Sequence, residues 1–310
     1  MSSRIGSRGA TFYTADNPPF GATFTYYLKE GLKTLEDQRI EAEKEAAKAK
    51  TDTAIPGYDE LRAEEEQIEP SVFLTVRDAQ GAVVRRIDVA SSKGLHRATW
   101  DLRYEGAKWV PGSRVDTGEP GSGPFGLPGD YTHQLTVKGE TFTESLRVEP
   151  DPRIKTSATD LEAQAVFALG IRDQLTRIAD MAATIHGVRE QLEDRNTRLA
   201  GDPEAAPLIE KGTSLIAGLT TVEEAIHNPE AEVGYDILAG RSGGAKLYSR
   251  LSWLMLCAAD HNGPPTQGMV EVGTELGGEL ADQEEVLDRL LSVELASLNS
   301  LAAERSMPYV

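Results

Sequence analysis

The chain has 310 residues, of which 39% are hydrophobic and 6% aromatic, and this size predicts about two domains with small, mainly aliphatic cores. Fifty acidic residues against 32 basic ones give a formal net charge of −18, which disfavours nucleic acid and anionic lipid surfaces as partners. The single cysteine, Cys257, excludes an internal disulfide; it lies in the apolar run LSWLMLCAAD, where we expect a buried, unreactive thiol.

The sequence carries no recognisable targeting signal. The N-terminal segment has positive charge but lacks the apolar core of a secretory signal peptide. No stretch approaches the ~18 uninterrupted apolar residues of a transmembrane helix, so we expect no membrane insertion. Localisation therefore stays open, and export is expected only if the chain is part of a longer exported protein.

The first predicted elements are a strand and a charged excursion. The phrase GATFTYYL at residues 21–28 is rich in β-branched and aromatic residues, as strands are. Residues 32–50 are rich in Glu, Lys and Ala and predict a solvated helix supported by i,i+4 charge pairs. A second short helix is expected after Pro56-Gly57, through Gln67, although a flexible linker fits this half equally well.

Strand patterns resume at Pro70. Residues 71–89 predict two strands joined by a tight turn at 78–81, and GLHRATWDLRY predicts a third strand with Leu95, Ala98 and Trp100 as interior candidates. The Gly/Pro-rich segment 111–129 is expected to lack regular structure.

Residues 129–148 form the clearest hairpin pattern in the chain. Inward positions recur at every second residue, with Lys138-Gly139 as a two-residue loop; these positions are Tyr131, His133, Leu135, Val137, Phe142, Leu146 and Val148. This register places His133 opposite Glu144, and we expect them to form a cross-strand pair at one end of the core.

The second half of the chain is predicted to be helical. Thr159 and Glu162 suggest a capping box for a long helix that ends near Leu199. Further apolar stripes predict helices over 204–227, around 247–255, and from about Met269 to Ser306, while residues 228–244 are expected to form a loop. Short connections and narrow stripes favour an antiparallel four-helix bundle.

Motifs that suggest chemistry are weak. GSGPFG at 121–126 matches a dinucleotide-binding pattern but is followed by a predicted strand instead of a helix. GRSGG at 240–244 would make Ser242 the nucleophile of a hydrolase only above a parallel sheet, with Asp260-His261 downstream. Cys257 and His261 supply two zinc ligands, which do not make a site. We therefore predict no catalytic residue, no metal site and no cofactor.

Four sequence segments occur in an order that resembles the C-terminal part of bacterial sortilin-like β-propeller proteins of the VPS10/BNR type, which are often labelled glycosyl hydrolases. These segments are NPPFGATFTYYLKE, LTVRDAQGAVVRRI, GLHRATWDLRY and LPGDYTHQLTV. The resemblance implies a small immunoglobulin-like domain whose first strand, 21–28, pairs with SVFLTVR at 71–77. It also implies that any catalytic site lies on a propeller that this chain does not contain.

These patterns predict an α+β protein with two domains. Residues 11–156 are expected to form an immunoglobulin-like β-sandwich with the charged insertion at about 32–67, and residues 157–310 a four-helix bundle. Four side chains are predicted to have structural roles: Trp100, Tyr131, His133 and Glu144. We expect a non-catalytic accessory module that binds a propeller or self-associates. A hydrolase fragment and a glycan-binding sandwich, stacking sugars on Trp109 and the 111–129 loop, are the alternatives.

Overall fold

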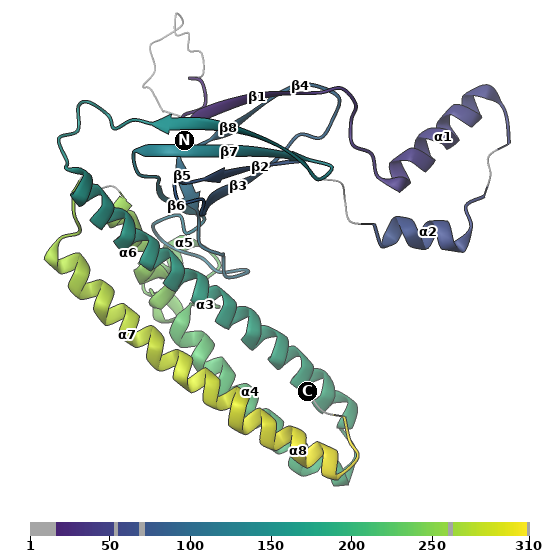
Figure 1. The fold of residues 1–310 in the computed structure, drawn as a ribbon. Helices are drawn as coiled ribbons and strands as arrows, with labels where there is room; N and C mark the ends of the chain where they lie inside the picture. The colour runs from purple at the N-terminus through teal and green to yellow at the C-terminus, as the bar shows by residue number, and fades with distance from the viewer. Residues whose placement is uncertain (1–16, 53–54, 68–71, 260–262, 309–310) are drawn as a thin grey trace, which may run out of the picture. The chain divides into compact units, whose positions relative to one another are not determined.

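The structure is a computed structural model that describes residues 17–52, 55–67, 72–259 and 263–308 (Figure 1). The chain is a mixed α+β protein with antiparallel sheets and several helices. Residues 11–16, 68–71 and Asp260-His261, which entered the predictions above, lie outside the described residues. No helix in the described part of the chain has the length and apolar character to span a bilayer.

The chain divides into two compact units that interleave along the sequence. Unit 1 comprises Met1–Val76, Arg85–Leu102 and Thr132–Glu144. Unit 2 comprises Arg77–Val84, Arg103–Tyr131 and Ser145–Val310, and includes the long helices.

Strand β1 (Ala22–Leu28) pairs antiparallel with β4 (Gly94–Trp100). The expectation that it pairs with residues 71–77 is therefore wrong. That segment forms β2 (Val72–Arg77), which lies between β3 (Val83–Val89) and β7 (Gly129–Val137) in a sheet of order β3-β2-β7-β8. Both edges of β2 are already hydrogen-bonded, so β1 has to pair elsewhere.

Only part of the predicted interior of β4 is buried. Trp100 is 0% and Ala98 is 9% exposed, but Leu95 is 69% exposed, so its predicted burial is wrong. Side chains of a strand alternate between its two faces. An odd-numbered residue such as Leu95 therefore cannot share a face with Ala98 and Trp100.

The Gly/Pro-rich segment contains a strand that was not predicted. β6 (Ser122–Phe125) pairs antiparallel with β5 (Arg103–Glu105). A Cβ atom on Gly123 would lie 2.1 Å from the carbonyl oxygen of Tyr104, so only glycine allows this close approach. The glycines that suggested irregular structure are thus what lets the two backbones pair.

The hairpin of β7 and β8 (Glu140–Val148) has the predicted two-residue loop. Lys138 and Gly139 have φ values of 51° and 84°, the positive values that a type I′ turn needs. Tyr131 is buried and its hydroxyl donates to the carbonyl of Leu127 at 2.6 Å. Phe142, however, is 57% exposed, so the predicted inward face of the hairpin is only partly buried.

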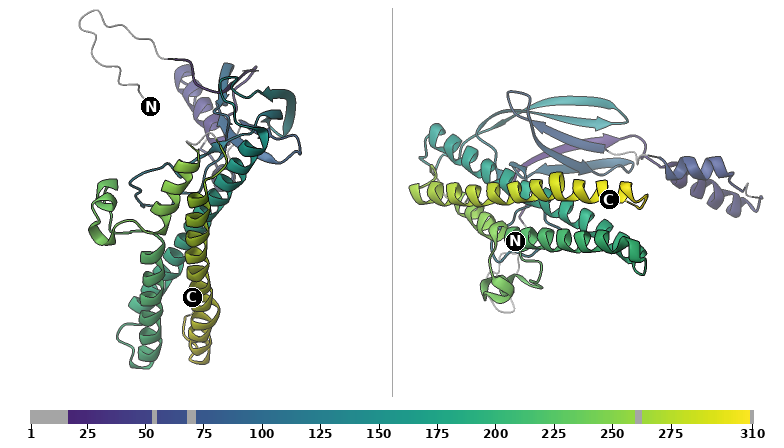
Figure 2. Two further views of the ribbon diagram at one scale, coloured as in Figure 1. Left: turned by 90° about the vertical axis from the view of Figure 1, so that its left-hand side faces the viewer. Right: turned by 90° about the horizontal axis from the view of Figure 1, so that it is seen from below.

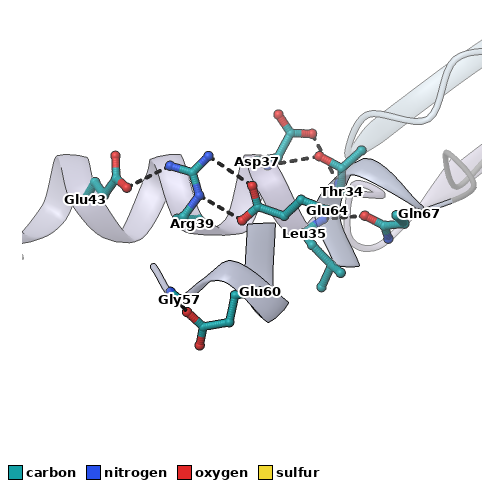
Figure 3. A network of polar contacts seen from close by, with 9 residues as sticks. All are labelled: Thr34, Leu35, Asp37, Arg39, Glu43, Gly57, Glu60, Glu64 and Gln67. Atoms are coloured by element: carbon teal, nitrogen blue, oxygen red, sulfur yellow. Dashed lines mark hydrogen bonds and ion pairs between the residues drawn. The ribbon is translucent and has the colours of Figure 1, made fainter. Parts of the chain in front are cut away.

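The charged excursion consists of two helices, α1 (Leu35–Ala49) and α2 (Tyr58–Glu65), neither of which has a buried residue. Arg39 connects them: its guanidinium donates to both carboxylate oxygens of Glu64 at 2.8 and 3.0 Å and to Glu43 at 2.8 Å (Figure 3). The second half of the excursion is therefore helical. Ion pairs, and not an apolar core, join the two helices.

The long helices of unit 2 run side by side, and Figures 1 and 2 both show α4 beside the helix formed by α7 and α8. The helices are α3 (Ala158–Leu199), α4 (Ala206–Ile226), α5 (Gly234–Leu238), α6 (Leu247–Ala259), α7 (Gln267–Arg289) and α8 (Ala296–Glu304), with a π-helical turn at Leu290–Leu295 between the last two. The short helix α5 lies in the segment predicted as a loop.

The start of α3 differs from the prediction. Its N-cap is Ser157, whose hydroxyl accepts the N–H of Asp160 at 3.1 Å and donates to the Asp160 carboxylate at 2.7 Å. The cap predicted at Thr159 is wrong, because Thr159 already lies inside the helix. The predicted end at Leu199 is confirmed.

The core of unit 2 is built from one aliphatic row on each long helix. α3 packs against α4, α6 and α7. The fully buried side chains include Ile171, Leu175, Ile178, Ile185, Leu192, Leu208, Leu215, Leu219, Ile226 and Leu251. Val272, predicted in the row of α7, is 43% exposed, which corrects that assignment. Ala107 and Val110 join this core from the segment between β5 and β6.

Trp100→Ala should lower the free energy of unfolding by about 3–5 kcal/mol, because it removes a fully buried indole. The matched control is Leu95→Ala on the same strand, which should cost less than ~0.5 kcal/mol because Leu95 is exposed. Urea unfolding of both variants measures the difference. Equal stabilities would contradict the burial of Trp100 in a core.

Candidate functional site

Unit 1 contains an open groove of about 650 Å³. Its lining includes Phe24 and Tyr26 of β1, Leu74 of β2, Leu135 of β7 and Phe142 of β8. This volume lies in the range of ordinary ligand pockets, roughly 300–1,000 Å³. We call it the unit 1 groove.

The groove also has polar lining residues, which include His133 and the charged side chains of Lys29, Glu30, Lys138, Glu140 and Glu144. The ring of His133 packs on Phe24 with centroids 4.2 Å apart, and its buried Nδ1 has no hydrogen-bond partner. Burial lowers the pKa of His133, and the nearby charge of Glu144 opposes this only partly. His133 and Glu144 both line the groove, as the register of the hairpin predicts, so the neutral imidazole is available to a ligand.

A second cluster of polar side chains lies among the helices of unit 2. Glu223, near the end of α4, is only 3% exposed. Its Oε1 contacts Nε2 of His186 on α3, and its Oε2 contacts the guanidinium of Arg189, one turn along α3. Nε2 of His227 lies 3.4 Å from the same Oε1, too far for a good hydrogen bond. We call these four residues the α3–α4 polar cluster.

The charge of Glu223 is stabilised by its neighbours. Burial alone would raise its pKa, but the contacts with His227, His186 and Arg189 together outweigh burial and lower the pKa to about 2. Glu223 is therefore ionised at neutral pH. A buried carboxylate of this kind needs such partners, since an unpaired charge in a protein interior is strongly disfavoured.

The backbone fixes the position of His227. It is the C-cap residue of α4, with its N–H bonded to the carbonyl of Glu223 at 3.0 Å. The next residue, Asn228, is buried, and its amide donates to the carbonyls of Arg241 and Gly244 at 3.3 and 3.0 Å. The glycine-rich turn 240–244 thus helps to anchor the end of α4.

Sequence analysis missed the α3–α4 polar cluster. His186 is 37 residues away from Glu223 and lies on another helix, so no short motif connects the two residues. The one local signal is the i,i+4 spacing of Glu223 and His227, which puts both side chains on one face at the end of α4.

The residues considered for hydrolase or zinc chemistry do not come together in the described part of the chain. Ser242 lies in a short 3₁₀ turn, Arg241–Gly243, and the segment before this turn forms α5. A nucleophile elbow needs a strand that leads into the turn, and here a helix precedes it. Cys257 is partly exposed on α6, which corrects its predicted burial. His261, which was considered with Cys257 as a zinc ligand and rejected as a site, lies outside the described residues.

Trp109, proposed above as a sugar-stacking residue, is 43% exposed. Its ring meets that of Tyr248 edge-on, with centroids 6.4 Å apart. Tyr248 is fully buried, which raises the pKa of its hydroxyl to about 12. One edge of Trp109 is thus packed on the helical core.

Comparison with known proteins adds no relative: no protein-family model, curated protein or solved structure matches this chain.

Glu223→Gln should lower the free energy of unfolding by about 1–3 kcal/mol in metal-free buffer, because it removes the buried carboxylate that pairs with Arg189 and contacts His186. The control is the neighbouring Glu224→Gln, which changes the same charge at an exposed position and should cost less than ~0.5 kcal/mol. Chemical denaturation of both variants measures their free energies of unfolding. Equal stabilities would mean that the buried contacts contribute nothing.

Proposed function

We propose that this chain is a non-catalytic interaction module that binds a β-propeller domain. Within this proposal the strands form an immunoglobulin-like sandwich and the helices an antiparallel bundle. The resemblance of its sequence segments to the C-terminal part of sortilin-like proteins is the reason for choosing a β-propeller as the partner. The unit 1 groove supplies the binding surface.

The observation that carries the proposal is the pair of strand edges beside the groove. Among the described residues, β1 pairs with β4 alone, and β8 is the last strand of its sheet. Phe24 and Tyr26 of β1 and Phe142 of β8 line the space that these strands border. An unpaired strand edge can bond the backbone of an added strand, and the apolar residues that line part of the groove can contact that strand's side chains.

The occupant that fits is therefore an extended segment of the partner with apolar residues at every second position. Such a segment would bond one strand edge and cover Phe142, whose side chain is 57% exposed. The unpaired Nδ1 of His133 offers one polar contact inside the groove. An added strand would also protect an edge that otherwise invites aggregation.

The proposal implies that a propeller domain is encoded immediately upstream of Met1, and the test uses that domain. Binding of the purified chain to this domain is measured by calorimetry, with wild type and Phe142→Asp. We expect measurable binding by wild type and at least ~10-fold weaker binding by Phe142→Asp, because the change removes an aromatic contact and adds a carboxylate beside Glu140 and Glu144, which also line the groove.

Tyr235→Asp is the control, since Tyr235 of α5 is a similarly exposed aromatic residue, at 64%, outside the groove. It should bind like wild type. The absence of propeller repeats upstream, the absence of binding by wild type, or an equal loss in both variants would each overturn the proposal.

A further inference from the structure

The α3–α4 polar cluster brings together the donor atoms that transition metals prefer. Donor atoms of His186, Glu223 and His227 all lie within 4.8 Å of one another. Ligands around a tetrahedral zinc ion lie roughly 3.3 Å apart, given bond lengths of about 2.0–2.2 Å. The 3.4 Å between Nε2 of His227 and Oε1 of Glu223 already matches this spacing, and small side-chain rotations would bring the other donors into place.

The imidazole of His227 is the independent observation that points to a ligand. This side chain is 4% exposed, and neither of its ring nitrogens has a hydrogen-bond partner. Buried polar groups are nearly always paired, so an unpaired buried imidazole beside a carboxylate needs an explanation. A metal ion provides one for Nε2, because it turns this nitrogen into a ligand.

Arg189 leaves one carboxylate oxygen for the ion. Its guanidinium contacts Oε2 of Glu223, whereas both imidazoles converge on Oε1. In this arrangement Arg189 orients the carboxylate from the side away from the ion, as outer-shell partners of metal ligands commonly do. The C-terminal end of α4, where His227 lies, carries the partial negative charge of the helix dipole and favours a cation.

We propose that His186, Glu223 and His227 bind one divalent transition-metal ion, for which zinc is the best fit. Two imidazoles and one carboxylate favour zinc and its transition-metal neighbours over calcium or magnesium, which prefer oxygen ligands. Three protein ligands leave a fourth position for water or for a donor from another molecule. The side chain of His186 is 36% exposed, so the ion can enter from solvent at this residue.

The site would link two helices. His186 comes from α3, and Glu223 and His227 come from the end of α4, so bound metal would hold these elements together. This role is separate from the groove of unit 1, and it requires no catalytic step.

The experiment uses the full chain with any purification tag removed and metal stripped by a chelator. Zn²⁺ is titrated by calorimetry, and Co²⁺ binding is followed by its visible absorption. We expect one equivalent of metal to bind to wild type, and at least ~10-fold weaker binding to His186→Ala and Glu223→Gln. The control His96→Ala, which removes a histidine of β4 bonded to the carbonyl of Ser92, should bind like wild type.

A second measurement needs no variant. Diethyl pyrocarbonate modifies accessible imidazoles, and mass spectrometry locates the modified residues. Zn²⁺ should protect His186 at least ~10-fold in rate and leave His96 unchanged. The proposal is overturned if folded wild type binds no stoichiometric metal, if His186→Ala binds as tightly as wild type, or if Zn²⁺ does not protect His186.

Discussion

The packing of the other helices against the aliphatic face of α3 is the interaction on which the core of unit 2 depends. This helix has 42 residues, and α4, α6 and α7 all pack against it. Its buried positions recur about every third or fourth residue, so they lie on one face of the helix. This apolar face has to be buried against other elements along its length. The neighbouring helices supply that cover with rows of their own, and Ala107 and Val110 extend it with residues from the β region.

This arrangement explains why the polar exceptions matter. Glu223 lies on the buried side of α4, where the other buried residues are leucine, valine, isoleucine and one glycine. Its charge is kept by contacts from α3, so the pairing of the two helices is specified by polar groups as well as by burial. Arg195 is a second exception: it is 3% exposed, and burial lowers the pKa of its guanidinium.

Unit 1 is held together differently. Its buried side chains include Trp100 of β4 and Val72, Leu74 and Val76 of β2, whereas the hairpin of β7 and β8 is only partly buried and lines a groove. Its charged helices α1 and α2 contribute no buried residue. Both proposals rest on departures from a fully apolar, fully buried core. In unit 1 the departure is incomplete burial beside the groove, and in unit 2 it is the polar cluster between α3 and α4.

Local periodicity made much of this fold predictable. The rows at Leu175, Leu215 and Leu276 are buried as expected, because a helix repeats its buried face within a few residues. Strand pairing was harder, since β1 and β4 are separated by the excursion and no local pattern tells which edge is free. The cluster at Glu223 was missed for the same reason: its members meet only after α3 and α4 have packed.

The account rests on α3 as the centre of the core of unit 2, and residue-resolved hydrogen exchange of the native chain tests this most directly. The internal reference is α1, a helix with satisfied backbone bonds but no buried side chain. The amides of α3 between Ile171 and Leu192 should exchange slowest, at rates set by global unfolding of unit 2. Exchange in this segment as fast as in α1 would contradict the account.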